Sequence, residues 1–191
     1  LGTGWYAADA ARVKPGGTAV VIGDGAVGLM AIIAAKHYGA EQIIAMSRHP
    51  SRQALAREFG ATEIVAERGD EGIQRVMELT RGIGADSVLE CVGLEQSMQQ
   101  ATSITRPGGM IGYVGVPHGV SFDGQKMFFA QTGMLGGPAP VRRFLPELLK
   151  LTLNGDIHPG KVFDLSLPLA QVADGYKAMD ERRAIKTLLT V

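Results

Sequence analysis

The sequence predicts an α/β fold with a parallel β-sheet and helices on both faces. The first observation is a short run rich in Val and Ile over residues 18–22, which ends in a glycine-rich turn. A helical pattern opens directly after that turn and stops at Gly39. The second observation is that strand-like and helical segments alternate along the rest of the chain. Such alternation is typical of crossover units that build a parallel sheet.

The elements follow one another in a regular order. After the helix that begins at Ala26, the pattern predicts strands at 42–46, 63–66, 85–91, 110–115 and 132–136, and helices at 51–59, 70–80, 95–104, 125–130 and 141–153. The segment 106–109, Arg-Pro-Gly-Gly, predicts a turn. From Lys161 onward, a strand at 162–167, a helix near 169–179 and a strand at 185–191 are expected to leave the main sheet. We therefore expect one domain over 1–160 and a separate C-terminal segment over 161–191.

The glycine-rich turn has the residues that dinucleotide binding requires. Gly23 would permit a tight strand-to-helix turn, Gly25 would let the backbone approach a pyrophosphate, and Gly28 would let the helix pack closely on the strand. The phosphates would then lie on the N–H groups at the start of the helix, near Ala26 and Val27. A nucleotide site is the interpretation that this arrangement favours over a purely structural turn.

Composition agrees with a soluble, enzyme-like domain. The 19 basic and 19 acidic residues balance, which gives no basic surface for nucleic acid or an anionic membrane. No apolar run approaches the roughly 20 residues that span a bilayer. Cys91 is the single cysteine, so a reducing, cytoplasmic setting is expected. The chain begins with Leu1 and is expected to be part of a longer protein.

The end of the second predicted strand indicates which cofactor is bound. Folds that bind NAD usually place Asp or Glu there to accept hydrogen bonds from the ribose 2′-hydroxyl. This chain has Ser47 and Arg48 instead, with no acid in the segment 46–50. Arg48 could pair with a 2′-phosphate and Ser47 could donate a hydrogen bond to it, while His49 and Arg52 could add positive charge. We therefore expect NADP rather than NAD.

Four segments in order give the chain a family resemblance. They are Lys14-Pro-Gly-Gly-Thr-Ala-Val-Val-Ile-Gly, Phe59-Gly-Ala-Thr-Glu-Ile-Val, Gly82-Ile-Gly-Ala-Asp-Ser-Val-Leu-Glu-Cys-Val-Gly and Arg106-Pro-Gly-Gly. Together they resemble the cofactor-binding half of medium-chain, zinc-dependent alcohol dehydrogenases. The resemblance implies a doubly wound Rossmann sheet of six parallel strands, normally paired with an N-terminal catalytic domain that this sequence does not contain.

The resemblance also implies further contacts to the nicotinamide half of the cofactor. The nicotinamide riboside would be lined by the backbones that end the fourth and fifth strands, at Cys91, Val92 and Gly93 and at Val114, Gly115 and Val116. The carboxamide would meet the main chain of Leu135 in the sixth strand. The side chain of Thr3 would lie beside the nicotinamide ring, and that of Lys186 beside the pyrophosphate. Cys91 is expected to be a small buried residue rather than a reactive thiol.

No residue of this chain is expected to be catalytic or to bind metal. The four histidines, His37, His49, His118 and His158, are scattered without the spacing of metal ligands. The resemblance implies that zinc binds in the missing half. There it would stabilise an alkoxide while hydride passes between the alcohol and the nicotinamide, or from the nicotinamide to an aldehyde or ketone in reverse. The chain by itself is expected to bind cofactor without turnover.

Three other classes compete with this interpretation. A zinc-free quinone or enone reductase of the same superfamily often has Ala where this chain has Gly23. An S-adenosylmethionine-dependent methyltransferase would typically have an acid where this chain has Ser47 and Arg48. A non-catalytic nucleotide sensor would carry its own start, which Leu1 disfavours.

The sixth strand predicts an assembly. Residues 132–137 would form the outermost strand, whose unpaired edge invites pairing with a second copy. Pro138 and Pro140 would then end that pairing because they lack N–H groups. A homodimer through this strand and the helix at 141–153 is expected, against the alternative that the helix or the tail covers the edge.

Overall fold

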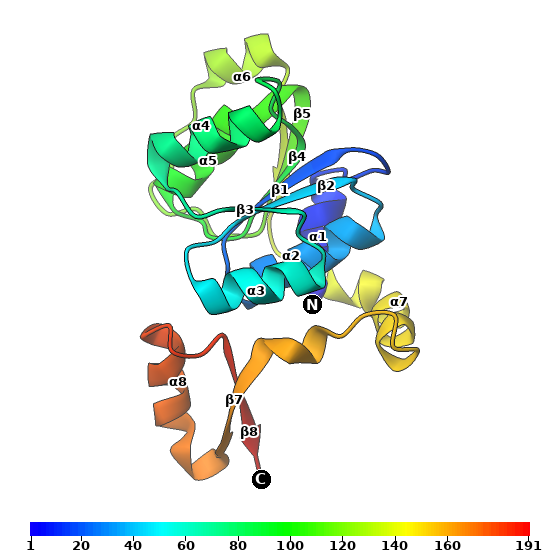
Figure 1. Cartoon of the computed structure of the whole chain (residues 1–191), viewed down its shortest axis with the longest axis vertical. Coiled ribbons are helices and arrows are strands. Elements are labelled where there is room, and N and C mark those ends of the chain that lie inside the picture. The colour runs from blue at the N-terminus through cyan, green and yellow to red at the C-terminus, as the bar shows by residue number, and fades with distance from the viewer. The chain divides into compact units, whose positions relative to one another are not determined.

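The computed structural model describes all residues from 1 to 191 and divides the chain into two compact units (Figure 1). The first unit comprises Leu1–Leu149 and the second comprises Lys150–Val191. The expected boundary at residue 160 lies inside the second unit.

The first unit is built on a six-stranded parallel sheet in the order β3-β2-β1-β4-β5-β6. The strands are β1 (Thr18–Ile22), β2 (Gln42–Met46), β3 (Glu63–Val65), β4 (Ala85–Glu90), β5 (Thr105–Tyr113) and β6 (Gly133–Gly136). The predicted fold class is confirmed. The strand order reverses between β1 and β4, and ligands of such folds bind beyond the carboxyl ends of the strands at that reversal.

Helices cover both faces of this sheet (Figure 1). On one side lie α1 (Gly2–Ala10), α2 (Ala26–His37) and α3 (Pro50–Phe59), and on the other lie α4 (Gly69–Leu79) and α5 (Glu95–Ile104). The short α6 (Gly124–Ala130) precedes β6, and α7 (Val141–Leu153) follows it. Strand residues such as Val20, Ile44, Val88 and Ile111 form the buried core. Their near-continuous apolar runs fit strands that are covered on both faces.

The sequence pattern did not predict α1. Trp5, Ala7 and Ala8 are fully buried, and a Cβ added at Gly4 would lie 2.5 Å from the backbone nitrogen of Ala31 in α2. A helix that is buried nearly all round lacks the polar face by which an amphipathic helix is recognised.

The prediction that 106–109 form a turn before the fifth strand was wrong, because these residues lie within β5. Thr105 pairs with Ala85 and Met110 pairs with Ser87, so the intervening residues form an irregularity in the strand rather than a connection. Gly108 adopts a φ of +72°, and Arg106 donates a hydrogen bond to Asp86. The Pro and Gly residues of this segment, which are typical of turns, therefore belong to a bulge in β5.

The second unit contains a separate two-stranded parallel sheet. Its strands are β7 (Phe163–Pro168) and β8 (Lys186–Thr190), connected through α8 (Val172–Asp180), and short 3₁₀ helices lie at Pro159–Val162 and Leu169–Gln171. The carboxylate of Asp164 accepts hydrogen bonds from the amides of Ile185 and Lys186 and so holds the start of β8 beside β7. The tail adds no strand to the main sheet.

Candidate functional site

The turn between β1 and α2 is closely packed against the protein at Gly23 and Gly28 and open at Gly25. Gly23 has a φ of +113°, which favours glycine, and a Cβ on Gly28 would collide with the carbonyl oxygen of Gly23. A Cβ on Gly25 would meet nothing within 4 Å. Gly23 and Gly28 are therefore required by the backbone itself, whereas Gly25 leaves the surface above the turn free.

The start of α2 is suited to bind an anion. Gly25 is its N-cap, no side chain caps the helix, and Gly25, Ala26 and Val27 are partly exposed. The first N–H groups of a helix have no intrahelical partner, and the helix dipole places positive charge there. Because the helix lies directly behind the open turn, these groups face the space that Gly25 leaves free.

Asp24, between the first two glycines, is the centre of a hydrogen-bonded cluster at the end of β2. Its Oδ2 atom accepts hydrogen bonds from the Ser47 hydroxyl at 3.0 Å and from the Arg48 amide at 3.3 Å. Its Oδ1 atom lies 3.5 Å from Nη1 of Arg52, and its carboxylate lies 3.8 Å from Nδ1 of His49. The segment 46–50 has no acid of its own, but the fold brings one to it from the β1–α2 turn.

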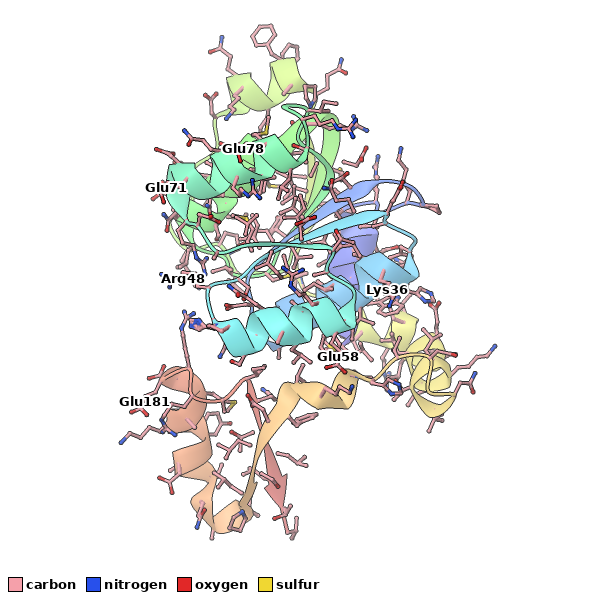
Figure 2. The ribbon with its side chains drawn as sticks, in the orientation of Figure 1. Lys36, Arg48, Glu58, Glu71, Glu78 and Glu181 are labelled. Carbon is pink, nitrogen blue, oxygen red and sulfur yellow. The ribbon has the colours of Figure 1, made fainter.

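The cluster changes how the basic residues of this segment are interpreted. Arg52 is 6% exposed and directs its charge to Asp24, so it adds little positive field outside the protein. Arg48 is exposed and lies on the loop between β2 and α3 (Figure 2). The side chain of Arg48 can therefore bind a ligand, whereas that of Arg52 would first have to break its contact with the carboxylate of Asp24.

The charge state of Asp24 follows from its partners. Burial by itself would raise the pKa of this carboxyl, but the Ser47 hydroxyl, the charges of His49 and Arg52 and the Arg48 amide together hold the pKa below its ordinary value. Asp24 is therefore a carboxylate at neutral pH, and it is one of the functional candidates that sequence reasoning missed. The available signal was an acid between two glycines of the turn.

The ends of β4 and β5 form the adjoining part of the same edge. A Cβ on Gly23 would lie 2.9 Å from Cγ2 of Val92, so the glycine turn meets the end of β4. A Cβ on Gly93 would collide with the carbonyl oxygen of Val116, and one on Gly115 with the amide nitrogen of Gly93. The segments 91–93 and 114–116 are thus packed backbone to backbone beside the turn.

Glu90 holds these two segments together, and sequence reasoning did not single it out. Its fully buried side chain accepts hydrogen bonds from the amides of Val92 and Gly93, both at 2.9 Å. Its carbonyl oxygen accepts one from the amide of Val114 at 2.9 Å. Glu90 therefore acts on the shape of the edge and has no access to a ligand.

Cys91 as a residue is partly exposed and not buried as expected, but its thiol has the properties of an unreactive group. Burial, and next the neighbouring carboxylate of Glu90, raises the pKa of its thiol well above the ordinary value. The thiolate is the reactive form of cysteine, so this environment suppresses reactivity.

The remaining predicted residues lie on three other elements. Thr3 is partly exposed in the first turn of α1, where its neighbour Gly2 packs against Val141. Leu135 lies in β6, opposite Gly112 of β5, and is 48% exposed. Lys186 begins β8 of the second unit and is exposed. The structure therefore gathers the residues of 23–28, 47–48, 91–93 and 114–116 at one edge, while these three stand on separate elements.

The structure also bears on metal binding and on membrane spans. No group of three or more His, Cys, Asp or Glu side chains is arranged to hold a metal ion. None of the helices combines the length and the apolar character needed to cross a bilayer.

Comparison with known proteins shows the family to which this chain belongs. The family model for zinc-binding dehydrogenases matches residues 26–152. The chain belongs to this family. It corresponds to the Rossmann-type half of zinc-type alcohol dehydrogenases, as the resemblance predicted.

Individual relatives give the extent of the match. A probable zinc-binding alcohol dehydrogenase of Mycobacterium tuberculosis is 36% identical over 92% of this chain and 45% of its own length. An NADP-dependent isopropanol dehydrogenase of Clostridium beijerinckii is 32% identical over 94% of this chain and 51% of its own. The solved alcohol dehydrogenase of Thermus sp. ATN1 superposes with a TM-score of 0.92 at 33% identity, covering 100% of this chain and 56% of that one. The chain thus spans about half the length of these dehydrogenases.

Proposed function

We propose that this chain is the nicotinamide-cofactor domain of a zinc-dependent alcohol dehydrogenase. The observation that carries the proposal is the open glycine turn on the uncapped start of α2, in one continuous edge with the ends of β4 and β5. The full enzyme would transfer hydride between a small alcohol and the corresponding aldehyde or ketone. The names of the relatives, which are alcohol dehydrogenases, support this reaction class.

Each part of the edge has a distinct task in this proposal. The amides that begin α2 would bind the pyrophosphate above Gly25, and the backbones of 91–93 and 114–116 would line the nicotinamide riboside. The exposed Val92 and Val116 would exclude water from the nicotinamide ring. When bound, the cofactor supplies a hydride acceptor or donor, and this chain supplies orientation. Thr3, Leu135 and Lys186 are proposed as further contacts to the ring, the carboxamide and the pyrophosphate.

We propose that the catalytic zinc binds outside this chain. With no cluster of metal-ligating side chains, the residues present do not fit a catalytic zinc site, so we assign the metal to the part of the enzyme outside this sequence. We propose that the isolated chain binds cofactor, catalyses no alcohol oxidation and holds no stoichiometric zinc. Elemental analysis and a dehydrogenase assay check this, and clear turnover of an alcohol would contradict it.

We further propose that the cofactor is NADP and that Arg48 binds its 2′-phosphate. Arg48 is exposed at the end of β2, and the segment 46–50 contains no acid. The NADP-dependent isopropanol dehydrogenase of Clostridium beijerinckii supports the choice by its name. We also propose a cytoplasmic location, because the single cysteine of this chain cannot form a disulfide within it.

Calorimetric titration with NADP and NAD tests the choice of cofactor. The chain should bind NADP more tightly, and Arg48→Ala should weaken NADP binding about 10- to 100-fold while leaving NAD almost unchanged. Arg57→Ala removes the same charge from an exposed position in the last turn of α3 and is the matched control. Equal affinities for the two cofactors, or tighter binding of NAD, would contradict the proposal.

A further inference from the structure

We infer that Asp24 limits the preference for NADP by competing with the 2′-phosphate for the hydrogen-bond donors at the end of β2. The inference rests on the proposed function and adds a specificity-determining residue to it. Asp24 comes from the β1–α2 turn and not from the end of β2, where an acid selects NAD in other dinucleotide folds.

The donors are the first part of the argument. The Ser47 hydroxyl and the Arg48 amide each have one hydrogen to donate, and both are directed to Oδ2 of Asp24. Ser47 is 2% exposed, so its hydroxyl cannot turn to an outside ligand without leaving a buried carboxylate short of a partner. The two donors that a 2′-phosphate would use at this place are therefore already bound within the protein.

Charge is the second part. Asp24 is 5% exposed, and Arg52 compensates its charge from within the protein. A 2′-phosphate would bring a further charge of about −1.5 to −2 to the neighbourhood of this carboxylate. Arg48 is then the exposed cation that must balance both the new charge and the nearby acid. NAD has a neutral hydroxyl at this position and needs neither the donors nor the compensation.

These two effects predict opposite results for Arg48 and Asp24. Replacing Arg48 removes the attraction for the phosphate, whereas neutralising Asp24 frees the donors and removes a repulsion. Asp24→Asn has the same shape as the native residue, but its single acceptor oxygen cannot accept from Ser47, Arg48 and Arg52 together, so part of the donor set is released. This variant should bind NADP about 10-fold more tightly, with NAD affinity within about twofold of the unmodified chain.

Titration of both cofactors to Asp24→Asn tests the inference, and adenosine 2′-monophosphate against AMP isolates the ribose end. Glu78→Gln is the control, because it removes one negative charge from an exposed position in α4 and should leave the ratio of the two affinities unchanged (Figure 2). Retained NAD binding shows that the Asp24 variant is folded. An unchanged or lower affinity ratio in a variant that still binds NAD would overturn the inference.

Ser47→Ala gives a second measurement that does not depend on Asp24→Asn. If the hydroxyl serves Asp24, its removal should change NADP affinity no more than it changes NAD affinity. A selective loss of NADP binding of about 10-fold would show that Ser47 serves the phosphate instead, and would overturn the inference. Arg48→Ala distinguishes failure of the proposed function from failure of this inference. If the chain has no preference for NADP, Arg48→Ala should leave the ratio of NADP to NAD affinity unchanged.

Discussion

Among single residues, Gly25 and Gly28 separate what folding requires from what binding requires. Both belong to the glycine turn, but only Gly28 has protein in the way of a side chain, namely the carbonyl oxygen of Gly23. Gly25 has an ordinary φ of −78° and open space above it. The fold itself does not require glycine at such a position, which supports the proposed approach of the pyrophosphate to this backbone.

We predict that Gly25→Ala and Gly28→Ala fail in different ways. Gly25→Ala should unfold at the same denaturant concentration as the unmodified chain but lose cofactor affinity, because its methyl group occupies the space proposed for the pyrophosphate. Gly28→Ala should reduce the free energy of unfolding by about 1–3 kcal/mol, because the added methyl group would collide with the carbonyl oxygen of Gly23. Urea unfolding with calorimetry on both variants checks this. Full cofactor affinity in Gly25→Ala would contradict the placement of the pyrophosphate.

At the scale of the elements, one acid joins three strands at the amino edge of the sheet. The carboxylate of Asp86 in β4 accepts a hydrogen bond from the amide of Thr18 in β1 at 2.8 Å, and another from Nε of Arg106 in β5 at 2.8 Å. Burial would raise the pKa of Asp86, but these two hydrogen bonds and the charges of Arg106 and Lys14 hold it below the ordinary value. This edge lies opposite the proposed cofactor site, so its role is stability.

The lowered pKa of Asp86 predicts how stability depends on pH. A carboxyl whose pKa is lower in the folded state stabilises it above the unfolded pKa of about 3.9, and this contribution is lost as the pH falls through the folded pKa. Asp86→Asn should therefore cost about 1–3 kcal/mol at pH 7, and progressively less as the pH falls below about 4. Chemical unfolding across pH 3 to 7 measures the difference. Asp156→Asn, at an exposed position, is the control, and an effect of Asp86→Asn that did not shrink in acid would contradict the assignment.

At the scale of the whole molecule, the free edge of β6 is the feature that bears on assembly. β6 pairs with β5 along one edge and is the last strand in the sheet order. Leu135 is 48% exposed, and Pro138 and Pro140 follow the strand. An edge with exposed apolar residues invites pairing with a second copy, and proline without an N–H group would end that pairing. We propose a homodimer through β6 and the adjoining helix α7.

Light scattering at tens of micromolar tests this proposal. The chain should have the mass of a dimer, and Leu135→Lys should give a monomer because a charge at the paired edge would be buried against its own copy. Ile83→Lys places the same charge at an exposed apolar position between α4 and β4 and should leave the dimer intact. A monomer without any substitution would refute the dimer, and a dimer that survives Leu135→Lys would place the interface elsewhere.

The sequence by itself determined the elements whose signals are local. The helices at 95–104 and 141–153 and the strand at 42–46 have the bounds that their patterns predicted, because periodicity and helix-ending residues act over a few neighbouring positions. The same holds for the glycine turn, where the backbone requirements of Gly23 and Gly28 follow from the tightness of the turn. Local signals were thus sufficient for the α/β fold and for placing the candidate site after β1.

Only the tertiary structure decided which distant residues meet. Burial on all sides removed the polar face by which α1 could be recognised, and pairing with β4 turned the segment 106–109 into part of a strand. The pairing of β1 with β2 also set Asp24 against Ser47 and Arg48, residues more than 20 positions away. A sequence pattern describes neighbours along the chain, whereas the charge around a ligand depends on neighbours in space. The acid that the segment 46–50 lacks is therefore supplied by Asp24 of the β1–α2 turn.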